Sequence, residues 1–579
     1  MLWQCSTVPA SAVDRLRSEL RISPRIARLL VKQGLTEPAT AERFLHPRLA
    51  DLGDPFQITH LEAAADRLVQ ALRADEKIAI VGDYDVDGVT STALLVSILR
   101  HFGLAPEYFV PRRMQEGYGL TEASVERLLK ACEPSLVIAL DCGTNSVAEV
   151  AALRDRGIDV IIVDHHQSRD GIPQNCWLVN PHVFDAPEAP WARLCTAGLV
   201  FKLVHGLVKR LRQHGDPVAK RLKLKDYLDF VALGTVADLV PLREENRILT
   251  RFGLTRLSAC PRQGMRALFE VSGMTLGQAV EPVDISFRLG PRINASGRLA
   301  DAALPVGMLL SEDFATCNEA ARQLEAFNRE RQAIERRMVE EAAASISALG
   351  KPPAGLLVYG DDWHPGVVGI VAGKLAREFN RPCIALGRDG DLAVGSGRSC
   401  SGIDLQCVLG RCGDLLQEWG GHPMAVGITL AEANVSAFAE AFASAVAEYV
   451  SHQPPSGHTL TITDWVASQD LGDDLLNEMD MLRPFGEANP EPVLGVPAVT
   501  LRRPLDRFGD GHFRFQIPTG NGRPVAGIAW RKADNPVPVG EPVDLAVKFY
   551  RHHFNGRVFP QAELLDWRPS QGANGSATT

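Results

Sequence analysis

The sequence predicts an α/β protein with a parallel sheet in its first half, and three observations support this. Apolar runs at residues 77–82, 135–143 and 158–166 have the length and composition of buried strands. Helical segments at 121–132 and 146–156 lie between them, as expected when consecutive strands are parallel. Each run leads into an acidic residue, and such sheets bind ligands at the carboxyl ends of their strands.

The rest of the chain divides into regions of different pattern. Residues 315–349 carry alternating charges without proline or glycine, which predicts a long solvent-bridging helix between domains. Short alternating runs separated by turn residues predict a small β-barrel or sandwich near the end. The expected division is an N-terminal helical extension at 1–70, an α/β catalytic domain at 71–310, a connecting helix at 311–350, a second α/β domain at 351–452, a β-barrel at 458–568 and a disordered tail at 569–579.

Composition points to an ordinary globular protein. The 579 residues are 45% hydrophobic and 23% charged. No apolar run reaches 18 residues, so we expect no membrane span. The first residues lack the pattern of a signal peptide, and the eleven scattered cysteines lack metal-ligand spacing, so we expect a cytoplasmic protein with reduced thiols.

The charge distribution leaves two interpretations open. A net charge of −9 argues mildly against nucleic acid as a partner. However, the segment from Lys202 to Lys225 holds eight basic residues against one acid, Asp216. This run is either a solvated helix face or a rim that attracts phosphate.

An acidic cluster follows the first predicted strand. The segment GDYDVDG places Asp83, Asp85 and Asp87 at alternate positions, where an extended or turning backbone lets their side chains converge. Three such charges repel one another unless a cation neutralises them, and Mg²⁺ or Mn²⁺ prefers oxygen ligands. A calcium loop or a surface turn is the alternative, but the closing glutamate of an EF-hand is missing.

Two further acidic positions follow the neighbouring strands. Asp141 comes after the second strand, and Asp164 with His165 and His166 comes after the third. Mixed carboxylate and imidazole donors favour Mn²⁺ or Mg²⁺ over Ca²⁺. The donors suffice for two ions, the arrangement that stabilises both oxygens in phosphoester hydrolysis. The sequence therefore predicts a metal-dependent phosphoesterase.

The motifs around these residues resemble a known superfamily. GDYDVDG, LDCGT, VDHH and LGTVAD (233–238) are similar to successive motifs of the DHH phosphoesterases, and their order resembles the RecJ branch of 5′→3′ single-strand-specific DNA exonucleases. The resemblance extends roughly from Val81 to Phe485 and implies DHH, DHHA1 and OB-like domains in that order. Supporting segments are EGYGL (116–120), FRLGPRINASGRL (287–299), DWHPGVVGI (362–370), GSGRS (395–399) and GGHPMAVG (420–427).

The resemblance also implies roles for individual residues. It makes Asp87, Asp141, His165 and His166 catalytic, and it places Asp164 behind them as an orienting group. Asp229 is a rival to Asp238, although we favour a helix-surface position for it. The implied ligands of two Mn²⁺ or Mg²⁺ ions are Asp83, Asp85, Asp87, Asp141, His165 and Asp238.

Strand-binding residues are expected in the glycine-containing segments, where guanidinium groups can bind phosphate bidentately. Intramolecular ion pairs are the alternative for the arginines, and a buried position is the alternative for the histidine. The implied DNA or phosphate contacts are Tyr118, Arg292, Arg298, Arg398 and His422. Possible stacking or clamping residues of the barrel, most of which we expect in its core, are Phe513, Phe515, Trp530, Tyr550, Arg551 and Phe554.

The function implied is hydrolysis of 5′-terminal phosphodiesters of single-stranded DNA to 5′-mononucleotides, in DNA repair and recombination. The expected partners are single-stranded DNA, a helicase and a single-strand-binding protein, and the chain is expected to be a monomer. One rival is a phosphoesterase of the same superfamily that acts on short oligonucleotides or cyclic dinucleotides. Another is a non-catalytic replication scaffold, which the full set of acids and histidines disfavours.

Overall fold

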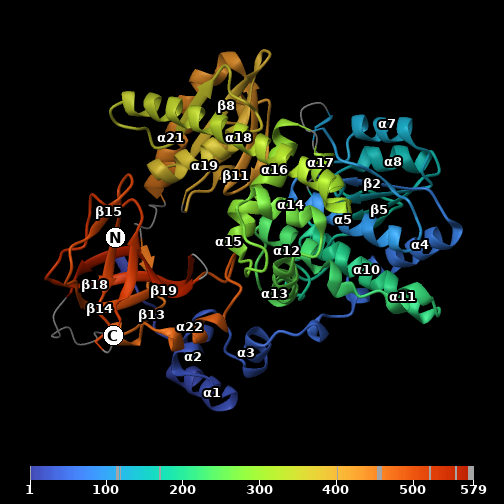
Figure 1. Cartoon of the computed structure of the whole chain (residues 1–579). Coiled ribbons are helices and arrows are strands. Elements are labelled where there is room, and N and C mark those ends of the chain that lie inside the picture. The colour runs from blue at the N-terminus through green and yellow to red at the C-terminus, as the bar shows by residue number, and fades with distance from the viewer. Residues whose placement is uncertain are drawn as a thin grey trace.

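The computed structural model describes residues 2–112, 116–117, 119–168, 171–300, 302–400, 402–452, 459–520, 523–554 and 557–570. Figure 1 shows two α/β parts, one on the right and one at the top, and a β-rich part on the left. The N-terminal helices lie below, close to the β-rich part. Within the described residues, no helix is long and apolar enough to cross a membrane.

The first α/β part contains the predicted parallel sheet. Its five strands run parallel in the order β3-β2-β4-β5-β6, which confirms the topology expected from the apolar runs. Every residue of β2 and β4 is buried, as a continuous apolar run predicts for a strand covered on both faces. The strands are β2 Ile78–Gly82, β3 Glu107–Phe109, β4 Leu136–Leu140, β5 Asp159–Val163 and β6 Trp177–Val179.

Helices cover both faces of this sheet. On one face, α4, α5 and α10 share a core with the strands and with α12. On the other face, α7 and α8 pack over the alternate strand residues. The helices of this part are α4 Leu61–Ala74, α5 Val86–His101, α7 Glu122–Ala131, α8 Val147–Asp155, α9 Pro181–Phe184, α10 Thr196–Gln213, α11 Pro217–Arg221, α12 Leu228–Ala237 and α13 Glu244–Ala259.

A helical segment connects the two α/β parts. The long helix α18 begins and ends close to the predicted limits, but it does not bridge solvent. Its first half packs on α14, α16 and α17, and its second half packs on α19 and β7, because apolar residues recur along its inner side. The helices are α14 Gln263–Val271, α15 Pro282–Asp284, the π-helical turn η4 Ile285–Leu289, α16 Gly290–Leu299, α17 Ala303–Leu310 and α18 Phe314–Ala348.

The second α/β part is built on a mixed sheet of order β10-β11-β9-β8-β7, in which only β7 and β8 are parallel. Helix α19 packs on one face of the sheet, and α20 and α21 pack on the other. The elements are β7 Leu356–Gly360, α19 Val368–Phe379, β8 Cys383–Asp389, β9 Leu392–Arg398, α20 Leu405–Leu409, β10 Glu418–His422, β11 Ala425–Ala431 and α21 Val435–His452.

The C-terminal part is a seven-stranded sheet of order β13-β14-β18-β19-β17-β16-β15 around its own core. The N-terminal segment is not a purely helical extension, because β1 Leu2–Gln4 pairs in parallel with β12 Thr459–Thr461. The other elements are α1 Ala10–Leu20, α2 Pro24–Lys32, α3 Pro38–Leu45, β13 Asp464–Trp465, α22 Asp473–Asp480, β14 Leu494–Thr500, β15 Asp506–Phe508, β16 His512–Ile517, β17 Val525–Ala529, β18 Pro542–Phe554 and β19 Arg557–Pro569.

A buried arginine ties the N-terminal helices, the first α/β part and the C-terminal part together. Arg247 of α13 is 2% exposed and lies 3.6 Å from the centre of the Phe44 ring. Its guanidinium donates to the backbone carbonyls of Phe44 and Arg483, each at 2.8 Å. One side chain therefore satisfies backbone groups that lie far apart in the sequence.

We expect Arg247→Met to destabilise this junction, because each buried carbonyl that loses its donor costs about 1–3 kcal/mol. Calorimetric unfolding should begin at a lower temperature, and limited proteolysis should cut the N-terminal helices sooner. Arg251→Met is the matched control, since half-buried Arg251 makes a longer hydrogen bond, 3.4 Å to the Leu45 carbonyl, and no other within the described part of the chain. Equal unfolding of the two variants would contradict this role of Arg247.

Candidate metal centre

The carboxyl ends of three neighbouring strands bring three aspartates together. Asp83 follows β2, Asp141 follows β4 and Asp164 follows β5, and each is only 1% exposed. Asp141 has a φ of 64°, a left-handed conformation in which aspartate and asparagine are more common than other non-glycine residues. The sheet therefore fixes the position of each carboxylate before any ligand binds.

The start of α5 positions the other two acids of the first motif, and of the two expected conformations, extended or turning, the backbone adopts the turn. Asp85 is the N-cap of α5 and accepts hydrogen bonds from the backbone amides of Asp87 and Gly88, at 2.9 and 3.1 Å. Asp87 lies in the first helical turn. Its carboxylate converges with the others because the chain turns into a helix there.

Asp87 is held by the N-terminus of a second helix. The backbone amides of Thr196 and Ala197, at the start of α10, donate to its two carboxylate oxygens at 2.7 and 2.9 Å. The Thr196 hydroxyl donates to Asp141 Oδ1 at 2.8 Å. The amides and the helix dipole stabilise negative charge at Asp87, so this carboxylate is fixed for ligand binding.

His165 lies at the centre of the cluster. Its Nε2 is 3.4 Å from Asp141 Oδ1, 3.5 Å from Asp238 Oδ2 and 4.0 Å from Asp87 Oδ2. Asp238 is the C-cap of α12 and comes from outside the sheet. Donors from the ends of β2, β4, β5 and α12 thus surround one small volume.

Asp164 lies behind this volume and orients its neighbours. It accepts hydrogen bonds from the backbone amides of Thr144, His165 and His166 at 2.8–3.1 Å. Its Oδ1 also lies 2.7 Å from His166 Nδ1. In that contact a carboxylate sets the tautomer and the ring orientation of a histidine.

The raised pKa values of the acids reflect burial first and crowded negative charge second. Burial, reinforced by the charge of Asp141, raises the pKa of Asp85 to about 7 and raises that of Asp87 well above its usual range. Burial also raises the pKa of Asp238 to about 6. Although burial opposes it, the contact with Asp164 raises the pKa of His166 to about 9. A divalent cation would remove the repulsion that holds protons on these acids.

The donor set fits a hard divalent cation. Among the described residues there are three groups of three side chains, and within each group the donor atoms lie within 4.8 Å of one another. One group has carboxylates alone, and the other two combine carboxylate with imidazole. Such donors suit Mg²⁺ or Mn²⁺. The groups are Asp83 with Asp85 and Asp141, Asp87 with His165 and Asp238, and Asp141 with His165 and His166.

We expect Mn²⁺ affinity to increase with pH. Ligands must lose their protons to bind metal. Because the pKa values of Asp85 and Asp238 are raised to about 7 and about 6, a growing fraction of these groups is protonated as the pH falls from 8 to 5. Calorimetric titration with Mn²⁺ should give weaker binding and more protons released per ion at pH 6 than at pH 8. Identical Mn²⁺ affinities at pH 6 and pH 8 would contradict the raised pKa values of these ligands.

The predicted strand-binding residues have different environments. Arg292 and Arg298 lie in the helix α16, whose sequence GPRINASGRL contains the expected glycines. Arg292 forms a 2.7 Å ion pair with Glu325, and Arg298 donates to the Gly366 carbonyl at 2.7 Å. His422, at the end of β10, is exposed and not buried. Tyr118 lies outside the described residues.

Arg398 differs from these arginines. It ends β9, it is half-buried, and burial lowers its pKa. Among the described residues it makes no ion pair, and its one hydrogen bond goes to the Gly397 carbonyl at 2.8 Å. A half-buried guanidinium without a carboxylate is a natural receptor for phosphate.

Other sequence expectations are also revised. Asp229 is not on a helix surface, because it is fully buried and forms a 2.8 Å ion pair with Arg262. It lies outside the donor groups. The basic run from Lys202 to Lys225 is not one helix face, since Lys202 is buried against Glu245 at 2.9 Å.

The candidate stacking or clamping residues of the C-terminal part divide into core residues, an exposed residue and residues with internal partners. Phe513 and Phe515 are core residues, as expected for most of them. Trp530 is 46% exposed and lies 5.8 Å from Phe508, measured between ring centres. The remaining candidates bind internally or are not described: Tyr550 bonds Gln561, Arg551 pairs with Asp473 and Asp480, and the Phe554 side chain lies outside the described atoms.

Several residues of the site were not predicted. Thr196 supports two acids, and the Asn294 side chain accepts a hydrogen bond from the Val86 amide of the first motif at 3.0 Å. The Asn180 side chain donates to Thr144 and to the His166 carbonyl, each at 2.8 Å. These contacts join distant segments, so no local pattern indicates them.

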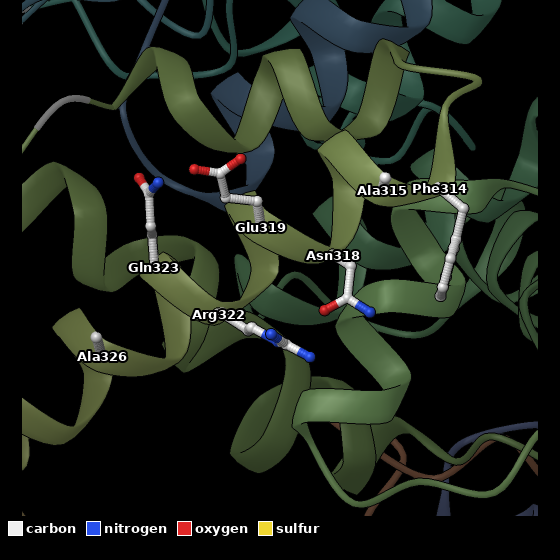
Figure 2. Close-up of a pocket in the computed structure, with 7 residues that line it drawn as sticks. All are labelled: Phe314, Ala315, Asn318, Glu319, Arg322, Gln323 and Ala326. Carbon is white, nitrogen blue, oxygen red and sulfur yellow. The ribbon is translucent and has the colours of Figure 1, made fainter.

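A hollow of about 670 Å³ lies away from this site, on the outer side of α18. All seven residues that line it belong to that helix, from Phe314 to Ala326 (Figure 2). None of them is a donor of the cluster. The carboxylate and histidine cluster therefore remains the candidate for chemistry.

Three family models match the chain in consecutive regions. The DHH family, N-terminal domain, matches residues 77–235, the DHHA1 domain matches 353–448 and the RecJ OB domain matches 464–566. These matches, with the mixed α/β structure, confirm the predicted fold class and the predicted order of domain types.

Curated relatives are similar over most of the chain. The single-stranded-DNA-specific exonuclease RecJ of Bacillus subtilis is 37% identical, over 86% of this chain and 62% of that protein. The chain thus spans less than two thirds of this relative. The exonuclease RecJ of Dickeya dadantii is 36% identical over 92% of this chain and 94% of that protein. That of Escherichia coli is 34% identical over the same shares.

Solved structures agree with these relatives. The crystal structure of RecJ from Thermus thermophilus in complex with Mn²⁺ has a TM-score of 0.81 at 29% identity, and it covers all of this chain and 81% of that chain. The Mg²⁺ complex has a TM-score of 0.76 at 27% identity, and it covers 98% of this chain and 79% of that chain. Both metals suit the carboxylate and imidazole donors of the cluster.

Proposed function

Because the chain belongs to the family of the single-stranded-DNA-specific exonuclease RecJ, we propose that it hydrolyses 5′-terminal phosphodiesters of single-stranded DNA and releases 5′-mononucleotides. It would act in DNA repair and recombination. The observation that carries this proposal is the convergence of five aspartates and two histidines in three overlapping donor groups, since each group can hold a divalent ion.

The roles proposed for the residues follow from their contacts. Two Mn²⁺ or Mg²⁺ ions, when bound, supply Lewis-acid stabilisation of the attacking and leaving oxygens of the phosphodiester. Their proposed ligands are Asp83, Asp85, Asp87, Asp141, His165 and Asp238. Asp164 orients the imidazole of His166 through Nδ1, and the proposed role of His166 is to act on the scissile phosphate.

One experiment tests the reaction and its polarity. A single strand labelled at its 5′ end or at its 3′ end is incubated with the protein and Mn²⁺, or with EDTA. We expect the 5′ label to appear at once as a mononucleotide, the 3′-labelled strand to shorten progressively, and EDTA to stop both. Release of the 3′ label first would overturn the polarity, and activity in EDTA would overturn the metal mechanism.

The substrate alternative is tested with the same protein. Dinucleotides and cyclic dinucleotides should be hydrolysed much more slowly than long single strands if the polymer is the substrate. Preference for the short substrates would instead favour the small-substrate phosphoesterase.

We further propose the domain limits 1–70, 71–310, 311–350, 351–452 and 458–568. The chain is proposed to be monomeric and cytoplasmic, and to cooperate with a helicase and a single-strand-binding protein.

Arg398 is the arginine that we expect to bind a substrate phosphate. Arg398→Gln should raise KM for single-stranded DNA by roughly tenfold, since a charge-assisted hydrogen bond contributes about 1.5–3 kcal/mol. Arg292→Gln is the control, because Glu325 already occupies that guanidinium. Steady-state hydrolysis of a 5′-labelled strand measures both variants. A larger increase in KM for Arg292→Gln would reverse the assignment.

A further inference from the structure

A cationic hollow lies on the first α/β part, at the end of α10 that is remote from the metal cluster. The hollow has a volume of about 560 Å³, and its walls come from α10, from α11 and from the turn η3 Leu224–Tyr227. Figure 1 shows α11 at the lower right. None of the described residues that line the hollow is acidic. Its cationic lining residues are Arg212, Lys220, Arg221, Lys223 and Lys225.

Most of this positive charge is not compensated by the protein. The nearest acids in the sequence are used elsewhere. Asp216 caps α11 by accepting hydrogen bonds from the amides of Val218 and Ala219, and Asp226 lies 3.5 Å from Arg256. An anion at this surface would therefore meet cations that have no other partner. The exposed cations of the hollow that form no ion pair within the described residues are Lys220, Arg221, Lys223 and Lys225.

The fifth cation holds the hollow in shape. The Arg212 guanidinium, near the end of α10, donates to the backbone carbonyls of Ala219 and Leu222 at 2.9 and 2.8 Å. It thereby fixes the chain that leads from α11 to η3. Lys209, one turn earlier in α10, is paired with Asp54 at 2.6 Å. The uncompensated charge is thus confined to the segment after α10, and that segment is held by the folded domain.

The distribution of the cations indicates a ligand with many negative charges. They come from α11, from the connection after it and from η3, so a ligand that meets all of them must carry several charges. Duplex DNA has one phosphate charge per ~1.7 Å of its axis, and lysine and arginine bind this backbone. Single strands are bound with the help of stacking rings, but the described lining residues include no Phe, Tyr or Trp. The composition of the hollow therefore fits a duplex backbone better than a single strand.

Helix α10 relates the hollow to the metal cluster. Its first amides hold Asp87, and its last turns carry Arg212. The helix has 18 residues, which at ~1.5 Å per residue separate its two ends by about 27 Å. A strand whose 5′ end lies at the metals can reach the hollow only after several nucleotides. At that distance the strand can already be paired with its complement.

We propose that the cationic hollow binds the phosphate backbone of duplex DNA that adjoins the single-stranded tail in the metal site. The inference rests on the proposed function and adds a contact with the part of the DNA that is not hydrolysed. An acidic segment of a partner protein also carries many charges. Duplex DNA is the favoured ligand because it is continuous with the substrate, so it is present at this distance whenever a tailed molecule is bound.

The test compares two DNA ligands in EDTA, so that neither is degraded. One is a single strand, and the other is the same strand continued at its 3′ side into a hairpin duplex. We expect the unaltered protein to bind the hairpin with a lower Kd than the single strand. This gain in affinity should appear only when the unpaired tail is long enough to span the distance from the metals to the hollow.

A variant that combines Lys220→Gln, Lys223→Gln and Lys225→Gln should lose this gain and keep the Kd for the single strand. For the hairpin, the slope of log Kd against log salt concentration should fall by about 2.7, at ~0.9 per lost phosphate contact. Hydrolysis of the single strand in Mn²⁺ should be unchanged, because none of the three lysines belongs to the donor groups.

A second variant controls for the change in net charge. It combines Arg15→Gln, Arg17→Gln and Arg48→Gln, which also removes three positive charges from exposed side chains. These arginines lie in the N-terminal segment, and each already has an acidic partner: Glu37, Asp14 and Asp51 respectively. We expect this variant to keep the gain in affinity for the hairpin and the steep salt dependence.

The outcomes separate the two proposals. If the chain hydrolyses single strands but binds the hairpin no more tightly, or if the lysine variant keeps the gain, the duplex contact is wrong and the function stands. Loss of binding to poly-glutamate in the lysine variant, with the hairpin gain unchanged, would overturn the duplex contact and assign the hollow to an acidic protein. If the unaltered chain neither binds nor hydrolyses single strands, the proposed function fails as well.

Discussion

Asp141→Asn should abolish hydrolysis of single-stranded DNA and leave the fold intact. Asp141 belongs to two of the three donor groups, with Asp83 and Asp85 in one and with His165 and His166 in the other. An amide is a neutral and weaker metal ligand than a carboxylate. We expect kcat to fall by roughly 10²–10³-fold, the scale on which removal of one transition-state-stabilising group acts.

Asparagine is the informative substitution at this position. Asp141 has a φ of 64°, which asparagine adopts more readily than alanine does. The amide oxygen can still accept the hydrogen bond of the Thr196 hydroxyl. Loss of activity would then report the lost charge and not a distorted backbone.

Asp229→Asn is the matched control for this experiment. Asp229 is also a fully buried aspartate, but its partner is Arg262 and it lies outside the donor groups. We expect Asp229→Asn to lower thermal stability and to retain Mn²⁺ binding in calorimetry. Asp141→Asn should show the opposite pattern. Near-normal kcat in Asp141→Asn would remove Asp141 from the metal centre.

The sequence predicted the position of this centre because the relevant pattern is local. A buried parallel strand followed by an acid can be recognised within about ten residues, and parallel topology brings such strand ends to one edge. Asp83, Asp141 and Asp164 were found in this way. Asp238 was not, since it ends a helix and only the resemblance indicated it.

The sequence could not predict the contacts that join distant elements. Arg292 and Arg398 both lie near glycines, yet one has a carboxylate partner from α18 and the other has none among the described residues. The segment around Arg292 is a helix despite its glycines, and this helix packs on α18. Lys202 belongs to a basic run, but its partner Glu245 lies 43 residues later.

Gly234 is a residue of the site whose importance only the packing reveals, and Gly234→Ala should disable the enzyme. A Cβ at this position of α12 would lie 2.5 Å from Asp87 Oδ1 and 2.7 Å from the Ala197 Cβ. To relieve this contact, α12 must move away from α5 and α10. Asp87 and Asp238, at the C-cap of α12, would then separate.

We expect Gly234→Ala to lower hydrolysis by roughly 10²-fold, as a displacement of about 1 Å in a catalytic group does. Mn²⁺ affinity should fall with it, and overpacking should cost about 1–3 kcal/mol of stability. Gly307→Ala in α17 is the matched control, because its nearest contact would be the Tyr108 hydroxyl at an ordinary 3.5 Å. Alanine there should keep activity and stabilise the helix by about 0.5–1 kcal/mol. Equal activity of the two variants would mean that α12 accommodates the extra methyl group without displacing Asp87 or Asp238. The close packing of α5, α10 and α12 around Asp87 would then not be required to hold the metal centre together.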